Sequence, residues 1–132
     1  MSTFYTYLAV MLGGALGTAA RMWLSGFLGR QYGETFPIGT LVVNVTGCFV
    51  IGFFSRLAGP EGPMLVSPTF RQFVTIGILG GYTTFSSFSL QTLNLLHDGD
   101  WLRGSLNILL SVGLCMLAVW LGNIGAAALH QR

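Results

Sequence analysis

The sequence has little charge and no lysine. Charged residues make up 8% of the 132 positions and apolar residues 52%, whereas an ordinary soluble domain carries roughly 25% charged residues. So few charges exclude a typical water-soluble domain. The composition therefore predicts a protein whose surroundings are the lipid bilayer, and we expect no nucleic-acid partner.

Four long apolar stretches divide the chain. Each is near or above the ~18–20 residues that a helix needs to cross the hydrocarbon core, and the connections hold most of the charge, proline and turn residues. We expect one all-α membrane domain over 1–132, with transmembrane helices at approximately 4–27, 38–56, 71–97 and 103–129. The first stretch lacks a basic leading segment and a small-residue cleavage site, so we interpret it as a permanent span.

No carboxylate is expected inside a span. The acidic residues all fall in connections: Glu34, Glu61, Asp98 and Asp100. A small-multidrug-resistance-type exporter has the same length and four spans, but it needs a membrane-embedded glutamate, so this alternative is disfavoured. An enzyme is not expected either, because His97 and His130 lie at a span end and near the C-terminus and complete no nucleophile–base or metal constellation.

The two cysteines do not form a recognisable motif. Cys48 and Cys115 fall in different spans among apolar neighbours, without the paired spacing of a zinc or redox site. Packing is the role that we expect for them.

The arginines divide evenly between the two sides of the membrane. Arg56, Arg71 and Arg132 fall on the side of the N-terminus, and Arg21, Arg30 and Arg103 fall on the other. Orientation is normally set by an excess of basic residues in cytoplasmic loops. An even division predicts dual topology, which allows an antiparallel homodimer with a two-fold axis in the membrane plane. The alternative is that one loop arginine dominates and a single orientation results.

Neutral hydrogen-bonding side chains stand inside the expected spans, where each needs a partner or a watery path. Thr40 and Asn44 are four residues apart, and Asn107, Ser111 and Cys115 follow at successive four-residue steps, so each set lines one helix face. Donors without compensating negative charge favour an anion, and the two sets could flank one path. The alternative is that these side chains join helices to one another. For the Gly-x-x-x-Gly pair Gly13 and Gly17, packing is the preferred role.

The third stretch contains GGYTTFSSFS at positions 80–89. Adjacent glycines followed by hydroxyl residues are a poor helix interior, so we expect the helix to unwind near Gly80–Thr83 and to resume beyond it. A break frees carbonyl oxygens, which are good ligands for a small hard cation. Beyond the break, Phe85 and Phe88 stand on one face with Thr84 and Ser87 beside them, and the alternative role for the two phenylalanines is lipid or core packing. An anion could meet the positive edge of a phenyl ring there while hydroxyls complete its coordination.

At these residues the sequence closely resembles the Fluc (CrcB-type) fluoride channels of microbes. The resemblance is carried by GGYTTFSSFS, by GTLVVN at 39–44 and by GGALGTAAR at 13–21, and it extends over all four spans. It implies a dual-topology homodimer in the bacterial inner membrane, with two pores that export cytoplasmic fluoride passively and so protect the cell from its toxicity.

The resemblance also implies roles for individual residues. The pore phenylalanines of the family match Phe85 and Phe88, its pore asparagine matches Asn44, and the hydroxyl pair between the phenylalanines matches Ser86 and Ser87. A structural Na⁺ on the dimer axis would be held by the backbone carbonyls of Gly80 and Thr83 from both subunits. Arg21 matches a shared arginine that could draw anions to a vestibule, although snorkelling to the interface explains it equally well.

Four positions depart from the family, and the first is Ser111, which stands where a histidine or an asparagine is frequent. Gln91 stands where a glutamate is frequent, so a role for that carboxylate cannot be carried over. Cys115 stands where a serine is frequent and is a weaker donor, which puts the far end of the polar set on the fourth span in doubt. Tyr82 replaces a common leucine beside the expected break.

Overall fold

The computed structural model of the chain describes residues 2–130, and within them the fold is entirely helical. The helices are α1 (Ser2–Tyr32), α2 (Ile38–Ala58), α3 (Pro68–Gln72), the π-helical segment η1 (Phe73–Leu79), α4 (Gly80–Tyr82), α5 (Phe85–His97) and α6 (Trp101–His130). In this part of the chain, four helical spans are long and apolar enough to cross a membrane, and the third runs from Pro68 to His97. The predicted all-α membrane class is therefore confirmed.

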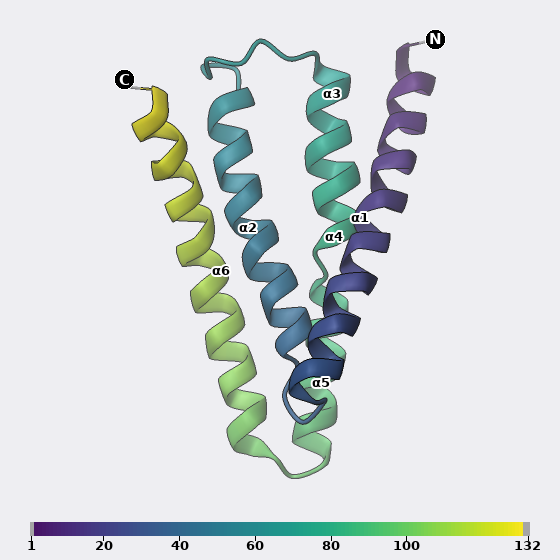
Figure 1. Cartoon of the computed structure of the whole chain (residues 1–132), viewed down its shortest axis with the longest axis vertical. Helices are drawn as coiled ribbons and strands as arrows, with labels where there is room; N and C mark the ends of the chain where they lie inside the picture. Colours follow the sequence, from purple (N-terminus) through teal and green to yellow (C-terminus); the bar gives the residue numbers. More distant parts are fainter. Residues whose placement is uncertain (1, 131–132) are drawn as a thin grey trace.

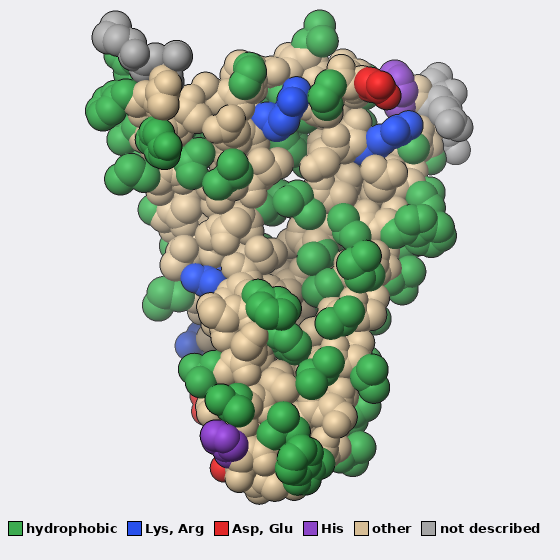
Figure 2. All heavy atoms as spheres, turned by 180° about the vertical axis from the view of Figure 1, so that it is seen from behind, with side chains coloured by type: hydrophobic (Ala, Val, Ile, Leu, Met, Phe, Trp, Pro, Cys, Tyr) green, Lys and Arg blue, Asp and Glu red, His purple; other side chains and the backbone are tan. Residues whose placement is uncertain are grey.

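The spans alternate in direction so that connections gather at two ends. Both ends of the chain and the α2–α3 connection lie at one end, whereas the α1–α2 and α5–α6 connections lie at the other (Figure 1). Hydrophobic side chains cover much of the long surface, and acidic and histidine side chains lie near the two ends of the face in Figure 2. Arg132, which the sequence assigns to the side of the N-terminus, lies outside the described residues.

Capping residues mark the starts of α3 and α6. Ser67 accepts a hydrogen bond from the Phe70 N–H, and proline follows it at the first helical position, which is a typical N-terminus. Asp100 caps the start of α6 in the same way. Its carboxylate accepts a hydrogen bond from the Arg103 N–H at 3.1 Å and forms an ion pair with the Arg103 guanidinium at 2.7 Å. These two contacts lower the pKa of the half-buried Asp100 carboxyl.

Glycines bring α1 and the third span into backbone contact. A Cβ on Gly13 would lie 2.7 Å from the carbonyl oxygen of Phe73, and one on Gly17 would overlap that of Ile78. From the other side, a Cβ on Gly81 would lie 2.5 Å from the carbonyl oxygen of Gly14. The packing role predicted for Gly13 and Gly17 is confirmed, and their partner is the third span.

The third span changes backbone conformation twice along its length. Residues 73–79 are π-helical, and Thr83 and Thr84 are extended, with φ,ψ of −83°,158° and −154°,116°. Gly80 and Gly81 are helical, so the extended residues are the threonines that follow the glycines. The close approach of α1 accounts for the glycine at position 81 without a break there, because a side chain at Gly81 would meet the backbone of Gly14.

Candidate functional site

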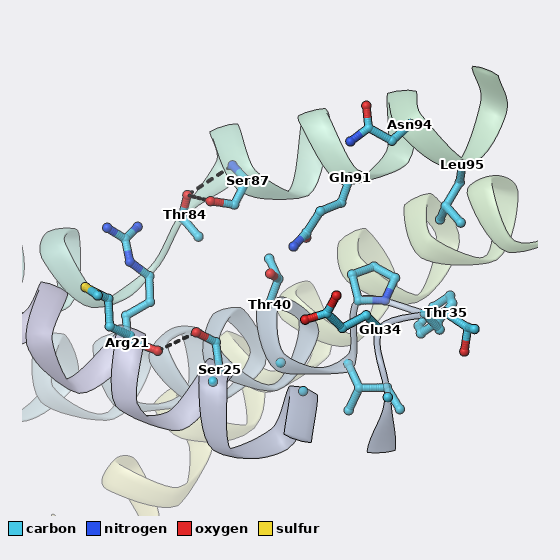
Figure 3. Close-up of a pocket in the computed structure, with 18 of the residues that line it drawn as sticks. Arg21, Ser25, Glu34, Thr35, Thr40, Thr84, Ser87, Gln91, Asn94 and Leu95 are labelled. Atoms are coloured by element: carbon cyan, nitrogen blue, oxygen red, sulfur yellow. Dashed lines mark hydrogen bonds between the residues drawn. The ribbon is translucent and has the colours of Figure 1, made fainter. Parts of the chain in front are cut away.

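A cavity of about 690 Å³ opens between α1, α2 and α5 at the end of the molecule that holds the α1–α2 connection. Five of the side chains predicted to form the anion path line it: Arg21, Thr40, Thr84, Ser87 and Gln91. They come from three spans and converge on one space, in which Gln91 of α5 faces Thr40 of α2 (Figure 3). Their hydroxyl, amide and guanidinium groups can donate to an anion.

Thr84 organises the hydroxyl groups at the inner end of this cavity. Its Oγ1 accepts from the Ser87 N–H at 3.2 Å, which caps the start of α5, and donates to the Ser87 Oγ at 3.1 Å. The Ser86 Oγ lies 3.3 Å from the same oxygen. Because Ser87 accepts from Thr84, its own O–H remains able to donate into the cavity (Figure 3).

Asn44 holds the extended segment of the third span. Its Nδ2 donates to the Thr84 carbonyl at 2.9 Å, and its Oδ1 accepts from the Thr84 N–H at 2.7 Å. The buried amide therefore pairs with both backbone groups of one extended residue, as a neighbouring strand would. One Nδ2 hydrogen is left to donate elsewhere.

Phe85 and Phe88 lie together but differ in exposure. Their ring centroids are 5.2 Å apart at an interplanar angle of 55°, so the two rings are in contact and tilted relative to each other. Phe88 is 8% exposed, whereas Phe85 is 76% exposed. The pair thus runs from the interior of the helix bundle to its surface.

The polar residues of α6 face α5 and satisfy one another. Asn107 donates to the Thr92 hydroxyl at 2.9 Å, Thr92 donates to the Phe88 carbonyl at 2.8 Å, and the Ser111 hydroxyl donates to Asn107 Oδ1 at 3.4 Å. All three side chains are buried, and Asn107 is only 1% exposed. These contacts match the helix-joining alternative, and a place for Asn107 and Ser111 in an anion path stays a prediction. Cys115 continues the row one turn further on and lies beside Cys48.

The carbonyls of Gly80 and Thr83 lose their regular helical donors. The N–H groups four residues ahead belong to Thr84 and Ser87, and these donate instead to Asn44 Oδ1 and Thr84 Oγ1. An Arg21 nitrogen lies 3.4 Å from the Thr83 oxygen as a long hydrogen bond. A metal-binding role for the Gly80 and Thr83 carbonyls stays a prediction.

Two features of the cavity were not predicted from the sequence. Glu34 and Asp98, which the sequence analysis assigned to connections, contribute to the lining of the cavity. Their position there depends on how the spans pack against one another, which the sequence alone does not show. Gln91 Oε1 is buried without a hydrogen-bond partner among the described residues.

Arg21 has no carboxylate within 4.0 Å among residues 2–130, because the ion pair found in that range joins Arg103 to Asp100.

Comparisons with known proteins agree on one family. The sequence model described as "CrcB-like protein, Camphor Resistance (CrcB)" matches residues 8–123. A protein of Opitutus terrae named "Fluoride-specific ion channel FluC" is 62% identical over 125 residues, which is 95% of each chain. Proteins with the same name from Methylocella silvestris and Rhodospirillum rubrum are 55% and 50% identical, over 95% and 96% of this chain and 95% and 98% of theirs.

Proposed function

The chain belongs to the CrcB family, and we propose that it is a fluoride-specific ion channel that lets cytoplasmic fluoride leave the cell down its electrochemical gradient. It is a multi-pass protein of the bacterial inner membrane, as its family and its four apolar spans indicate. The observation that carries the proposal is the convergence of neutral donors from α2 and α5 around the extended residue Thr84.

Passive export follows from the chemistry of the ion. Hydrogen fluoride is a weak acid that crosses bilayers uncharged and releases fluoride in a less acidic cytoplasm, where the anion is trapped. With the interior negative, outward movement of one anion gains ~2.3 kcal/mol per 100 mV. A selective pore therefore suffices, and we infer that the protein has no enzymatic step and no coupling ion.

The path that we propose begins in the cavity. Arg21 supplies positive charge there, and the donors of Thr40, Ser87 and Gln91 replace part of the hydration shell. Beyond the cavity, the path runs past Asn44 and Ser86 to the Phe88 and Phe85 rings, whose positive edges meet the dehydrated anion. Selectivity over chloride then depends on a narrow route whose donors suit a small, strongly hydrated ion.

We propose that the working unit is an antiparallel dual-topology homodimer with two pores. The even division of arginines supports insertion in both orientations. The 76% exposure of Phe85, which contacts the buried Phe88, supports a second subunit at this surface that completes the path.

A structural Na⁺ fits the chemistry of the extended segment. Small hard cations prefer oxygen ligands, and the Gly80 and Thr83 carbonyls have lost their helical donors to Asn44 and Thr84. We propose that these carbonyls from both subunits hold the ion. The bound cation would supply positive charge that braces the dimer, and it would not permeate.

Fluoride efflux from liposomes tests the function. The purified chain is reconstituted with internal potassium fluoride or potassium chloride, and efflux is started with valinomycin under an outward potassium gradient. We expect rapid release of fluoride, read by an ion-selective electrode, and retention of chloride. Comparable loss of both anions would refute a fluoride-specific channel, and protein-free liposomes control for leakage of hydrogen fluoride.

A further inference from the structure

The structure brings together the only two cysteines of the sequence, Cys48 of α2 and Cys115 of α6. These helices run in the same direction and lie side by side (Figure 1). Their backbones touch at Gly52, where a Cβ would overlap the carbonyl group of Val119. Cys48 precedes Gly52 by four residues, and Cys115 precedes Val119 by four, so the same register places the cysteines opposite each other.

The two thiols interact, in agreement with this register. The Cys115 thiol lies near that of Cys48, close enough for the two to interact electrostatically, and both are free and only partly buried. Within the described residues, no three histidine, cysteine or acidic side chains come together as a metal-binding group. The pair is therefore a two-ligand site and lacks the four ligands of a structural zinc site.

We propose that Cys48 and Cys115 bind a soft, thiophilic metal ion of linear two-coordinate preference, such as Hg²⁺, as a bis-thiolate bridge between α2 and α6. Thiolate sulfur selects soft ions over the hard cations of the medium. A linear bridge needs the sulfurs about 4.6 Å apart, twice a metal–thiolate bond of about 2.3 Å, and two neighbouring thiols can reach that separation by side-chain rotation.

The charge of the complex favours a divalent ion. Each thiol releases one proton as its sulfur–metal bond forms, so a dication and two thiolates make a neutral unit, and nothing is oxidised or reduced. Neutrality removes the free energy cost of a net charge inside an apolar span. The bridge would lie one turn beyond Asn44 on α2 and one turn beyond Ser111 on α6, so it would fix the spacing of two helices that carry predicted path residues.

Titration with mercuric chloride tests the site on the purified full-length chain. We expect one equivalent per chain to protect both thiols from a maleimide, as counted by mass spectrometry of the intact protein. In Cys48→Ser and Cys115→Ser, the remaining thiol should lose mercury to a competing monothiol roughly tenfold faster or more, because the second thiol no longer acts at high effective concentration. A requirement for two equivalents, or one thiol that stays reactive, would overturn the bridge.

Fluoride efflux supplies an independent readout. One equivalent of mercuric chloride should abolish most of the efflux of the wild-type chain, whereas Cys48→Ser should keep its basal efflux and resist the ion. Cys48 was not assigned to the path, which makes it the appropriate variant for this comparison. Equal inhibition of Cys48→Ser would show that the ion acts elsewhere and would refute the proposed cause.

Discussion

Phe88 tests whether aromatic rings contribute to permeation or only fill space. Phe88→Ile keeps an apolar side chain but removes the ring quadrupole, and a shape-tolerant apolar exchange usually costs under ~1.5 kcal/mol of stability. We expect the variant to fold while its initial fluoride efflux falls by roughly tenfold or more, which corresponds to about 1.4 kcal/mol in the barrier. Efflux is compared at equal amounts of folded protein after size exclusion.

Phe53→Ile is the matched control for this experiment. Phe53 lies in α2 outside the motif and stacks on Phe49 at a centroid distance of 6.3 Å, so it has an aromatic neighbour as Phe88 does. Its replacement should leave efflux near the wild-type rate. If Phe88→Ile also conducts at the wild-type rate, the ring has a packing role alone.

Asn44 should be sensitive to a change as small as Asn44→Asp. The carboxylate cannot donate to the Thr84 carbonyl, and it places a negative charge beside that oxygen and on the proposed anion path. Loss of a buried hydrogen-bond partner costs about 1–3 kcal/mol, so we expect a lower melting temperature as well as lower fluoride efflux. Asn123→Asp, at an exposed position of α6, is the control, and a wild-type melting temperature for Asn44→Asp would contradict this role.

At the scale of single residues, the sequence predicted which side chains share a helix face but not what they contact. The four-residue spacing identified Thr40 and Asn44 as one polar face, and the Phe-Ser-Ser-Phe run identified the aromatic pair. The pairing of Asn44 with the Thr84 backbone could not be predicted, because it joins residues 40 positions apart and depends on how α2 and α5 pack. Periodicity gives the face of a helix, whereas a partner requires the tertiary arrangement.

At the scale of elements, the contact between α1 and the third span should depend on Gly17. A side chain there would overlap the carbonyl group of Ile78, so Gly17→Val must push the third span away from α1 and disturb the extended residues beyond it. We expect a strong loss of folded protein and of efflux. Gly14→Val is the matched control, because it makes the same substitution in the same helix and a Cβ at Gly14 meets nothing within 4 Å.

Gly14→Val should therefore resemble the wild-type chain in monodispersity by size exclusion and in fluoride efflux. Equal behaviour of the two variants, whether both fold or both fail, would contradict a specific backbone contact at Gly17. The sequence predicted packing at the Gly-x-x-x-Gly pair but not its partner span, because small residues on several spans offered equivalent surfaces. For the same reason, the sequence predicted that the helix unwinds near Gly80–Thr83, whereas Gly81 remains helical and lies against α1.

At the scale of the whole molecule, orientation in the membrane can be read from the C-terminus. Paired reporters, one active only in the cytoplasm and one only outside it, are fused after the last residue and expressed from identical plasmids. The even division of arginines predicts comparable activity of both reporters. A lysine added to the α1–α2 connection should favour one orientation, and activity of a single reporter in the unmodified chain would refute dual topology.

Sodium removal tests whether a cation held by the Gly80 and Thr83 carbonyls stabilises the proposed homodimer. The channel is purified in sodium and then exchanged into N-methylglucamine, a cation too large for a site built from backbone oxygens. Without a cation, carbonyls that have lost their helical donors to Asn44 and Thr84 would face one another across the dimer axis without compensation. We expect the dimer to dissociate more readily on dilution and the fluoride efflux to fall, and both to recover when sodium, but not N-methylglucamine, is restored. Because a buried ion can leave slowly, exchange continues until the sodium content of the protein fraction is constant, and a sodium-free sample with wild-type efflux and an unchanged dimer would refute the site.

The Thr83 carbonyl oxygen also lies 3.4 Å from a guanidinium nitrogen of Arg21, and this guanidinium can offset part of the positive charge that is lost with the sodium ion. Arg21→Gln should therefore make the assembly more sensitive to sodium removal, whereas a purely vestibular role for Arg21 predicts no change in that sensitivity.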